Sequence, residues 1–359
     1  MNYGAWLAQA TGLTGPKLHY LYSRFSDAEE VYRAPREQIL TLEGLNEEEK
    51  NSLLGYRQRV SVEESNLRLA SMGIDFVCIE DANYPNRLKN IHNPPYGLFY
   101  RGKLPDETKR SVAIVGARGR SAYGEQVARK LSKTLAEHDV SIISGLAIGI
   151  DGDAHKGALE GGGRTYGVLA GGVETCYPAS HRFLYDKILD QGGVLSEYAP
   201  GTEPLSFMFP MRNRIISGLA DCVIVIEARE KSGSLITADF AMEQGRDVYA
   251  LPGRISDPLS RGCNCLIKQG AGVICSIEDF LQEWNLMCDR APIQMDFRKN
   301  LLEKEEALVY SLLDFRPVGL GKLMEQTPYG PAEILEILQK LERKGFAEEK
   351  LPNYYVRTI

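Results

Sequence analysis

The sequence predicts an α/β protein built around a parallel sheet, with a helical segment before it and a small mixed segment after it. Most of the chain's 35 glycines fall between Val112 and Ile274, at the ends of short apolar runs. A β-branched run that stops at glycine and leads into a helical stretch indicates a strand followed by a loop that approaches a ligand closely. Several such units in series make a parallel sheet whose carboxyl-end loops form one crevice. We therefore expect the functional site along that edge.

Residues 1–75 are predicted to form a helical domain, because apolar side chains recur at helical spacing from Trp6 to Leu69. A Gly-x-x-Gly turn at Gly12 and Gly15 leads into one of these helices. Small helical domains with such turns can bind the DNA backbone. The acidic run Glu47–Glu49 lies where a phosphate would have to approach, so a protein-interaction or packing module is the favoured interpretation.

Three further segments flank the sheet domain, which is assigned to residues 111–285. Residues 76–110 are a connector with two short strand candidates, and residues 286–300 are a linker. Residues 301–359 are predicted to be a winged-helix domain, with three helices before a hairpin. Its presumed recognition helix carries Glu333, Glu336 and Glu342 beside only two basic residues, which favours contact with protein over contact with duplex DNA.

Six apolar runs are the predicted strands of the sheet domain. They are Ser111–Gly116, Val140–Gly145, Thr165–Gly172, Gly192–Glu197, Asp221–Ala228 and Asp247–Gly253.

Composition excludes several classes of protein. The net charge is −6, and residues 111–275 carry 17 basic against 18 acidic side chains, so a site for a polyanion has to be a local cluster. No apolar run approaches the ~20 residues of a membrane span, and no basic flank precedes an apolar core near the N-terminus, so we expect neither a signal peptide nor a membrane partner. Seven cysteines without a Cys-x-x-Cys pair indicate a reduced, cytoplasmic protein without a metal site.

The loop after the first strand is Gly116-Ala117-Arg118. It does not match Gly-x-Gly-x-x-Gly, and the second strand ends without the acidic residue that would hold a ribose, so an NAD site is disfavoured. The chain also lacks the glycine-rich motif of nucleoside triphosphatases. What remains is an arginine at the crevice and Ser121 as the predicted N-cap of a helix that points free N–H groups at an anion.

The loops after the second and third strands offer fewer charges. Asp151 and Asp153 are expected to cap the N-terminus of a helix rather than to bind a metal. Gly171 and Gly172 leave backbone N–H groups uncovered, and Tyr177 either stacks a base or packs in the core. Arg182 opens the next helix, where it could meet a phosphate.

The last two loops carry the most specific clusters. Arg212 and Arg214 flank Asn213 at a predicted helix start, and paired guanidiniums favour phosphate. Ser232, Gly233 and Ser234 combine small hydroxyls with glycine at another helix start, which suits an anion without implying catalysis. No nucleophile–base pair is evident along the crevice. A row of anion sites with an aromatic ring suits a chain of phosphates, and so predicts single-stranded nucleic acid.

The order of these motifs resembles the DNA-processing protein A family (DprA/Smf). The resemblance runs through Gly116-x-Arg118, SGLAIGID, GVLAGG with the following Tyr177-Pro178, FPMRNRIISGL and SGSLITA. It implies an extended Rossmann-like sheet between a helical, sterile-alpha-motif-like domain and a winged helix. It also implies an accessory protein without enzymatic activity or cofactor, which forms a homodimer through the Rossmann-like domain. Such proteins bind and protect single-stranded DNA and load a RecA-type recombinase on it during natural transformation.

The resemblance assigns DNA contacts to four motifs, and Tyr177 and Arg182 are added from the residues themselves. The residues assigned by the resemblance are Gly116, Arg118, Gly171, Gly172, Arg212, Asn213, Arg214, Ser232, Gly233 and Ser234. Two positions depart from the family pattern, because Ile148 stands where an arginine is common and Ala179 where a lysine is frequent. We expect weaker binding and a shallower salt dependence than in a more basic member.

An alternative is a nucleotide-binding protein or a nucleotide phosphoribohydrolase of the lysine-decarboxylase-like group, whose cores are also Rossmann-like. That chemistry requires Pro-Gly-Gly-x-Gly-Thr-x-x-Glu, and this chain offers only Ala170-Gly171-Gly172-Val173-Glu174-Thr175. The single-stranded DNA hypothesis is therefore preferred.

Overall fold

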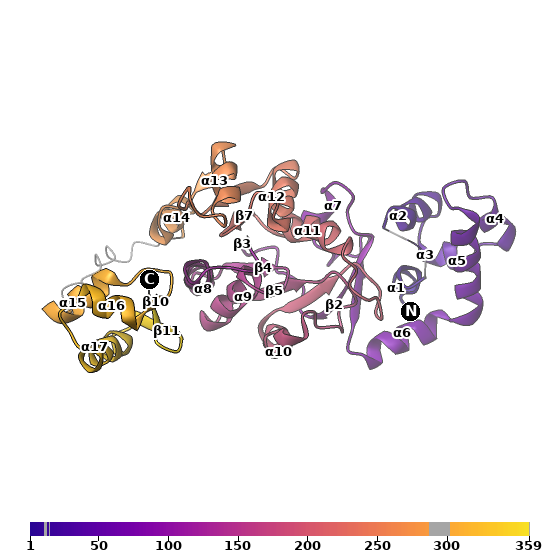
Figure 1. Cartoon of the computed structure of the whole chain (residues 1–359). Helices are drawn as coiled ribbons and strands as arrows, with labels where there is room; N and C mark the ends of the chain where they lie inside the picture. The colour runs from indigo at the N-terminus through magenta and orange to yellow at the C-terminus, as the bar shows by residue number, and fades with distance from the viewer. Residues whose placement is uncertain (11–12, 14, 287–301, 359) are drawn as a thin grey trace.

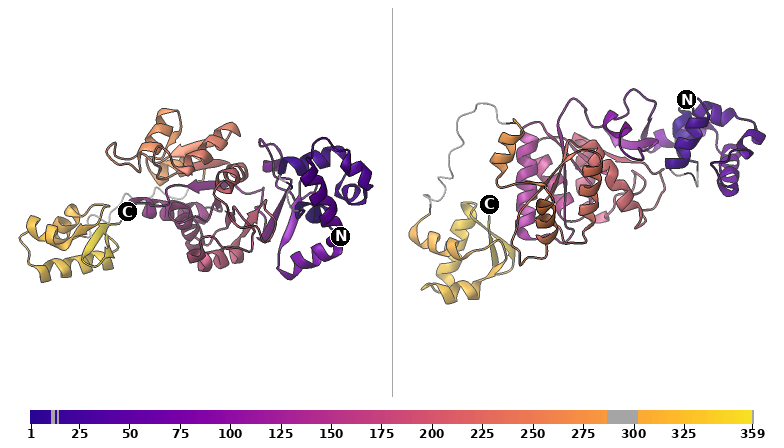
Figure 2. Two further views of the ribbon diagram at one scale, coloured as in Figure 1. Left: turned by 45° about the vertical axis from the view of Figure 1, so that its right-hand side comes forward. Right: turned by 90° about the horizontal axis from the view of Figure 1, so that it is seen from above.

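The computed structural model describes residues 1–10, 13, 15–286 and 302–358. It shows a central α/β core, with a helical unit at one end and a small α+β unit at the other (Figures 1 and 2). None of the helices that it describes has the length and apolar composition needed to span a bilayer.

Within the described residues, nine strands form the sheet of the core, in the order β1-β2-β6-β5-β4-β3-β7-β8-β9. In this order, every strand from β6 through β5, β4, β3, β7 and β8 to β9 is parallel to its neighbour. The strands β1 and β2 form an antiparallel edge beside β6. The bounds are β1 Asp75–Cys78, β2 Gly97–Gly102, β3 Ser111–Val115, β4 Ser141–Ser144, β5 Thr165–Val168, β6 Gly193–Ser196, β7 Cys222–Val225, β8 Asp247–Ala250 and β9 Gly272–Val273.

The predicted α/β fold is confirmed, and each of the six apolar runs contains one parallel strand. The two strand candidates of the connector form a hairpin that pairs with β6 through β2, so residues 75–102 extend the sheet rather than only link two domains. The direction of strand addition reverses at β3, which lies between β4 and β7. In open sheets of this kind, ligands bind beside the carboxyl ends of the strands at that reversal.

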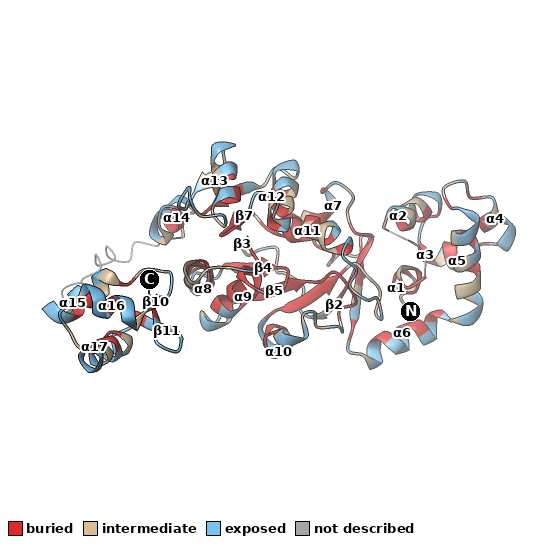
Figure 3. Cartoon of the chain, viewed as in Figure 1, coloured by how far each residue is buried: buried red, intermediate tan, exposed pale blue. Residues whose placement is uncertain are grey.

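Helices cover both faces of the sheet, because the buried strands are apolar on both sides (Figure 3). On β3, Val112 and Ile114 face one apolar cluster with α8, α9 and α14, whereas Ala113 and Val115 face another with α7, α11, α12 and α13. The helices of the core are α7 Asn86–Lys89, α8 Ala122–Glu137, α9 Ile150–Glu160, α10 Arg182–Gln191, α11 Met208–Leu219, α12 Gly233–Glu243, α13 Arg261–Lys268 and α14 Ile277–Glu283, with the 3₁₀ turn η1 at Ala179–His181.

The N-terminal unit consists of helices around their own apolar cluster, in which Trp6 and Leu21 are buried. That cluster also includes Cys78 and Tyr96, so the unit packs on the β1 edge of the sheet. Its helices are α1 Tyr3–Ala8, α2 Gly15–Arg24, α3 Ala28–Arg33, α4 Arg36–Leu40, α5 Glu47–Arg59 and α6 Val62–Ser71.

The C-terminal unit has a separate apolar cluster built on α17 and the hairpin. Its elements are α15 Lys304–Leu312, β10 Val318–Gly319, α16 Leu320–Gln326, α17 Pro331–Arg343, β11 Ala347–Leu351 and β12 Tyr354–Arg357. It contacts the start of α8, where Lys350 pairs with Glu125 at 3.4 Å and the ring of Phe315 lies 5.1 Å from that of Tyr123. The helices and the hairpin lie where the sequence places them, while the assignment of the unit as a winged helix stays a prediction, as do the other domain assignments.

Candidate functional site

A cleft of about 800 Å³ opens at the carboxyl edge of the sheet, beside the ends of β3 and β7. Its walls come from the loops after β3, β4, β5, β6, β7 and β8 and from α11. Of the predicted site residues, the cleft is lined by Gly116, Arg118, Tyr177, Arg212, Asn213, Ser232, Gly233 and Ser234. The lining does not include Gly171, Gly172, Arg182 or Arg214.

Two aromatic rings and an arginine form a ladder on one wall of the cleft. The guanidinium of Arg118 lies over the ring of Phe209, 5.4 Å from its centroid, and the ring of Tyr177 lies 5.7 Å from that of Phe209. Tyr177 is 52% exposed, so it is not a core residue and its ring is free to stack on a base. Arg118 is exposed as well and can meet a phosphate next to that base.

Arg212 lies at the floor of the cleft and is only 3% exposed. One guanidinium nitrogen donates to the carbonyls of Gly145, at 3.0 Å, and of Val168. Burial lowers the pKa of Arg212 to about 10, although the Asp151 carboxylate nearby opposes that shift. Burial likewise raises the pKa of Asp151, against the attraction of Arg212. Arg212 therefore ties together the ends of β4 and β5 and places a buried positive charge beneath the cleft.

Arg214 points away from the cleft. Its guanidinium makes a bidentate pair with Glu197, at 2.6 and 2.7 Å, and donates to the Asn93 carbonyl at 2.9 Å. Burial opposes the charge of Arg214, yet hydrogen bonds and attraction to Glu197 keep its pKa above the ordinary value. Its donors are thus used in joining α11 to the loop after β6 and to the connector.

The start of α12 forms another part of the wall. The hydroxyl oxygens of Ser232 and Ser234 lie 2.8 Å apart, and Asn213 donates from Nδ2 to the Gly233 carbonyl at 3.2 Å. Gly233 is exposed and a Cβ there would meet no heavy atom within 4 Å. The first-turn N–H groups of a helix have no partner within the helix and favour an anion, so this wall suits a phosphate.

The other predicted residues lie outside the cleft. The Gly172 N–H donates to the Thr202 carbonyl at 2.9 Å, and a Cβ on Gly171 would collide with the same carbonyl at 2.9 Å. Both glycines thus permit close packing of two loops. Arg182 is exposed and pairs with Asp186 at 3.1 Å on α10. At the positions that depart from the family pattern, Ile148 is exposed and Ala179 begins the η1 turn.

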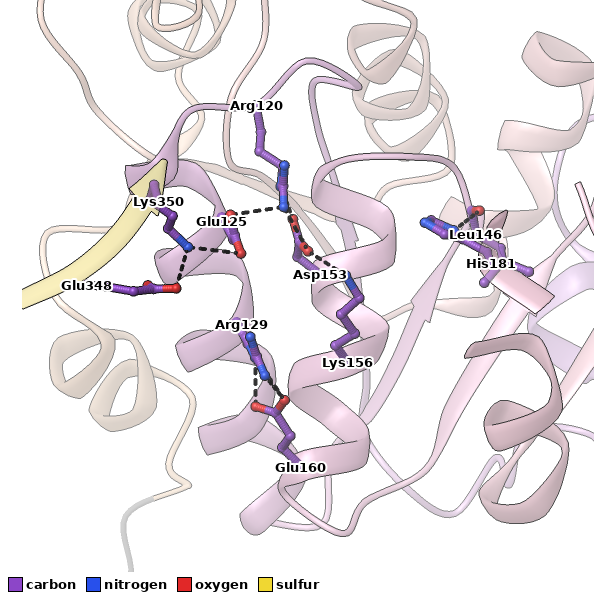
Figure 4. Close-up of polar contacts among 10 residues, drawn as sticks. All are labelled: Arg120, Glu125, Arg129, Leu146, Asp153, Lys156, Glu160, His181, Glu348 and Lys350. Atoms are coloured by element: carbon purple, nitrogen blue, oxygen red, sulfur yellow. Dashed lines mark hydrogen bonds and ion pairs between the residues drawn. The ribbon is translucent and has the colours of Figure 1, made fainter. Parts of the chain in front are cut away.

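The acidic residues of the second loop serve the protein itself. The Gly145 N–H donates to Asp151 at 3.1 Å, while Asp153 accepts from Arg120 and pairs with Lys156 at 3.3 Å (Figure 4). Gly149 is the N-cap of α9, so neither aspartate caps the helix. Within the residues that the structure describes, no group of His, Cys, Asp or Glu side chains is arranged to hold a metal ion. Ser121 caps α8 as predicted, accepting from the Gly124 N–H at 3.0 Å.

Among the cleft residues that are missing from the predicted set, one aromatic and two basic side chains can contact a nucleotide. Phe209 supports both Arg118 and Tyr177, and Arg229 and Lys231 line the cleft just before Ser232. The sequence contains a signal for them, because Phe209 precedes the Arg-Asn-Arg cluster and two basic residues precede Ser-Gly-Ser.

Comparison with known proteins identifies the family. The family model for DNA recombination-mediator protein A matches residues 75–285, which is the sheet domain with its β1–β2 hairpin. The chain belongs to this family.

Three curated relatives each match more than half of the chain. DNA processing protein DprA of Bacillus subtilis is 47% identical over 212 residues, which is 59% of this chain and 71% of the relative. DprA of Streptococcus pneumoniae is 48% identical over 206 residues, 57% of this chain and 73% of the relative. Protein Smf of Escherichia coli is 42% identical over 245 residues, covering 68% of this chain and 65% of the relative.

Solved structures support the same assignment. The X-ray structure of DprA from S. pneumoniae superposes with a TM-score of 0.67 at 37% identity, over 79% of this chain and 98% of that one. A structure describing the single-stranded DNA binding mode of DNA processing protein A from Helicobacter pylori superposes with a TM-score of 0.54 at 29% identity, over 60% of this chain and 97% of that one.

Proposed function

We propose that this chain binds single-stranded DNA in the cleft at the carboxyl edge of its sheet. The observation that carries the proposal is that the ladder of Arg118, Phe209 and Tyr177 lines the same cleft as the start of α12. A base can stack on the exposed Tyr177 ring while its phosphates meet Arg118 and the Ser232–Ser234 turn. The single-stranded DNA binding described for the H. pylori relative supports the proposal.

The core places few positive charges in this cleft. Arg118, Arg229 and Lys231 are exposed at its lining, and Arg212 adds a charge from below. Arg214 supports the site indirectly, since it fixes the helix that carries Asn213. Gly171, Gly172 and Arg182, which lie outside the cleft, contact DNA only if the strand continues past Tyr177.

The family resemblance supports the finer parts of the proposed function. The chain protects the strand and loads a RecA-type recombinase on it during natural transformation and recombination. It acts in the cytoplasm as a homodimer joined through the Rossmann-like domain, and as an accessory protein rather than an enzyme. The cleft offers arginines, hydroxyls and helix N–H groups, which suit binding of a phosphodiester without cleavage.

A competition titration tests the proposal. Fluorescently labelled oligo-dT is bound by the full chain, and unlabelled single strand or duplex of equal length is added while anisotropy is recorded. We expect the single strand to compete much better than the duplex, because the stacking surface needs exposed bases. Equal competition by duplex would move the site away from the cleft.

Incubation with nucleoside monophosphates tests the alternative of a phosphoribohydrolase. We expect no release of free base by the full chain, measured by chromatography. Release of free base with turnover would contradict the proposal and would assign catalysis to the same cleft.

A further inference from the structure

A second cavity, of about 530 Å³, lies between the core and the C-terminal unit. The core contributes Tyr123, Glu227, Arg254 and Asp257, and the C-terminal unit contributes Phe315 and Arg316. Figures 1 and 2 show the C-terminal unit beside the α8 end of the core. The cavity therefore exists only where these two parts of the chain meet.

The second cavity and the cleft share two walls. The loop after β3 lines the cleft with Gly116–Gly119 and the second cavity with Ser121 and Tyr123. The loop after β8 likewise contributes Leu259 to the cleft and Ser260 to the second cavity. The second cavity therefore neighbours the cleft along these two loops.

Like the cleft, the second cavity combines aromatic rings with guanidiniums, and its lining also includes the carboxylates of Glu227, Asp257 and Asp314. It has an aromatic pair, Tyr123 and Phe315, with the ring planes at 58° to one another. It also has two guanidiniums, since Arg254 pairs with Asp314 at 3.3 Å and Arg316 with Asp257 at 2.9 Å. Both arginine side chains are more than 60% exposed. Exposed pairs of this kind contribute little stability and leave guanidinium donors for a phosphate.

The buried acid of this cavity is used by the protein. Glu227 is only 6% exposed and accepts from both the N–H, at 2.8 Å, and the hydroxyl of Ser121. It therefore lies at the start of α8, where the helix dipole favours a negative charge. The groups that can meet a ligand are therefore the rings and those guanidinium donors that Asp257 and Asp314 leave free.

We propose that the second cavity holds a nucleotide of the same DNA strand, with its base on Phe315 and its phosphate on Arg316. This inference rests on the proposed function of the cleft. It makes the C-terminal unit part of the single-stranded DNA site, through two residues that lie just before β10. Because the cavity lies beyond the cleft, only a strand longer than the cleft can reach it.

The experiment is a length series of oligo-dT, from about 4 to about 16 nucleotides, titrated into the full chain by anisotropy. Phe315→Ala and Arg316→Glu are expected to bind the shortest strands like the wild type and to bind the longest strands at least about fivefold more weakly. Phe315→Tyr keeps the ring and is expected to keep the affinity for long strands. Thermal unfolding of each variant checks that the chain is folded.

Two controls separate this inference from the function on which it rests. Lys322→Glu changes charge by the same amount on α16, outside the second cavity, and is expected to leave affinity for long strands close to that of the wild type. Affinities equal to wild type at every length for Phe315→Ala and Arg316→Glu, or equal losses for Arg316→Glu and Lys322→Glu, would overturn the inference. Loss at all lengths in Arg118→Ala would still support the cleft, whereas no loss in that variant would overturn the proposed function instead.

Discussion

At the scale of single residues, the burial of an arginine decides what it does. Arg118, Arg212 and Arg214 all belong to motifs that the sequence predicts to contact DNA, yet their surroundings differ. Arg118 is exposed and lies over the Phe209 ring. Arg212 donates to backbone carbonyls beneath the cleft, and Arg214 pairs with Glu197 outside the cleft. The sequence identifies the cluster, but residues two positions apart on a helix point in different directions, and only the fold shows which one faces the ligand.

Arg214→Ala is expected to destabilise the fold. The substitution leaves the Glu197 carboxylate, whose side chain is 12% exposed, without its cation. Removing one partner of a buried ion pair lowers the free energy of unfolding by about 3–5 kcal/mol, which urea unfolding would detect. Arg129→Ala breaks an exposed pair with Glu160 and is expected to cost no more than about 1 kcal/mol. Equal costs for the two variants would contradict the structural role of Arg214.

His155 is expected to make stability depend on pH. Burial, and then the charges of His181 and Arg212, lower the pKa of His155 to about 3. In the unfolded chain an imidazole takes up a proton near pH 6.5. The unfolded state therefore binds more protons below that pH, and the free energy of unfolding falls as the pH drops from about 6.5 toward 3, by up to about 1.4 kcal/mol per pH unit.

The measurement is the free energy of unfolding of wild type and His155→Gln between pH 7 and pH 4.5. The free energy of unfolding of the variant, relative to that of the wild type, is expected to rise as the pH falls. A difference that stays constant across this range would show that His155 is not held neutral by burial.

At the scale of elements, the loops after the strands are fixed by close backbone contacts. Gly149 has φ +91°, and a Cβ there would lie 2.3 Å from the Ala117 carbonyl oxygen. The loop that carries Arg118 is thereby packed on the start of α9. The pattern of strands ending at glycine predicts that such contacts exist, and it places the strands correctly. It does not predict which loops touch, because strand order depends on pairing between distant segments, as the β2–β6 contact shows.

Gly149→Ala is expected to weaken both the fold and the DNA site. The added methyl group meets backbone atoms, and the positive φ adds strain, so we expect a loss of about 1–3 kcal/mol in stability together with weaker binding of oligo-dT. Gly119→Ala in the facing loop is the matched control. A Cβ at Gly119 meets no heavy atom within 4 Å. The stability of the Gly119→Ala variant is therefore expected to stay within about 0.5 kcal/mol of that of the wild type. Similar losses in both variants would contradict this account.

At the scale of the whole molecule, we propose that an acidic chain binds a polyanion through a small local cluster. The net charge is −6, and few exposed basic residues line the cleft. The sequence predicts this balance and the succession of helical, α/β and α+β units. It does not predict how the C-terminal unit meets the core, since that contact depends on scattered pairs such as Lys350–Glu125 and Tyr123–Phe315.

The small cluster predicts a shallow salt dependence. For short strands that meet the exposed residues Arg118, Arg229 and Lys231, the slope of log affinity against log salt is expected near −2, from about −0.7 per phosphate neutralised. Anisotropy titrations of oligo-dT from low to moderate salt give this slope directly. A slope steeper than about −5 would require a larger basic surface than the cleft provides.

The most direct test of the central claim is the affinity of Arg118→Ala for oligo-dT. The variant removes the guanidinium that lies over the Phe209 ring at the cleft, and Arg129→Ala removes an equal charge from α8 outside it. We predict that Arg118→Ala weakens binding by about 1–3 kcal/mol without loss of stability, while Arg129→Ala binds like the wild type. Unchanged binding by Arg118→Ala, or equal weakening by both variants, would contradict the assignment of the cleft as the site for single-stranded DNA.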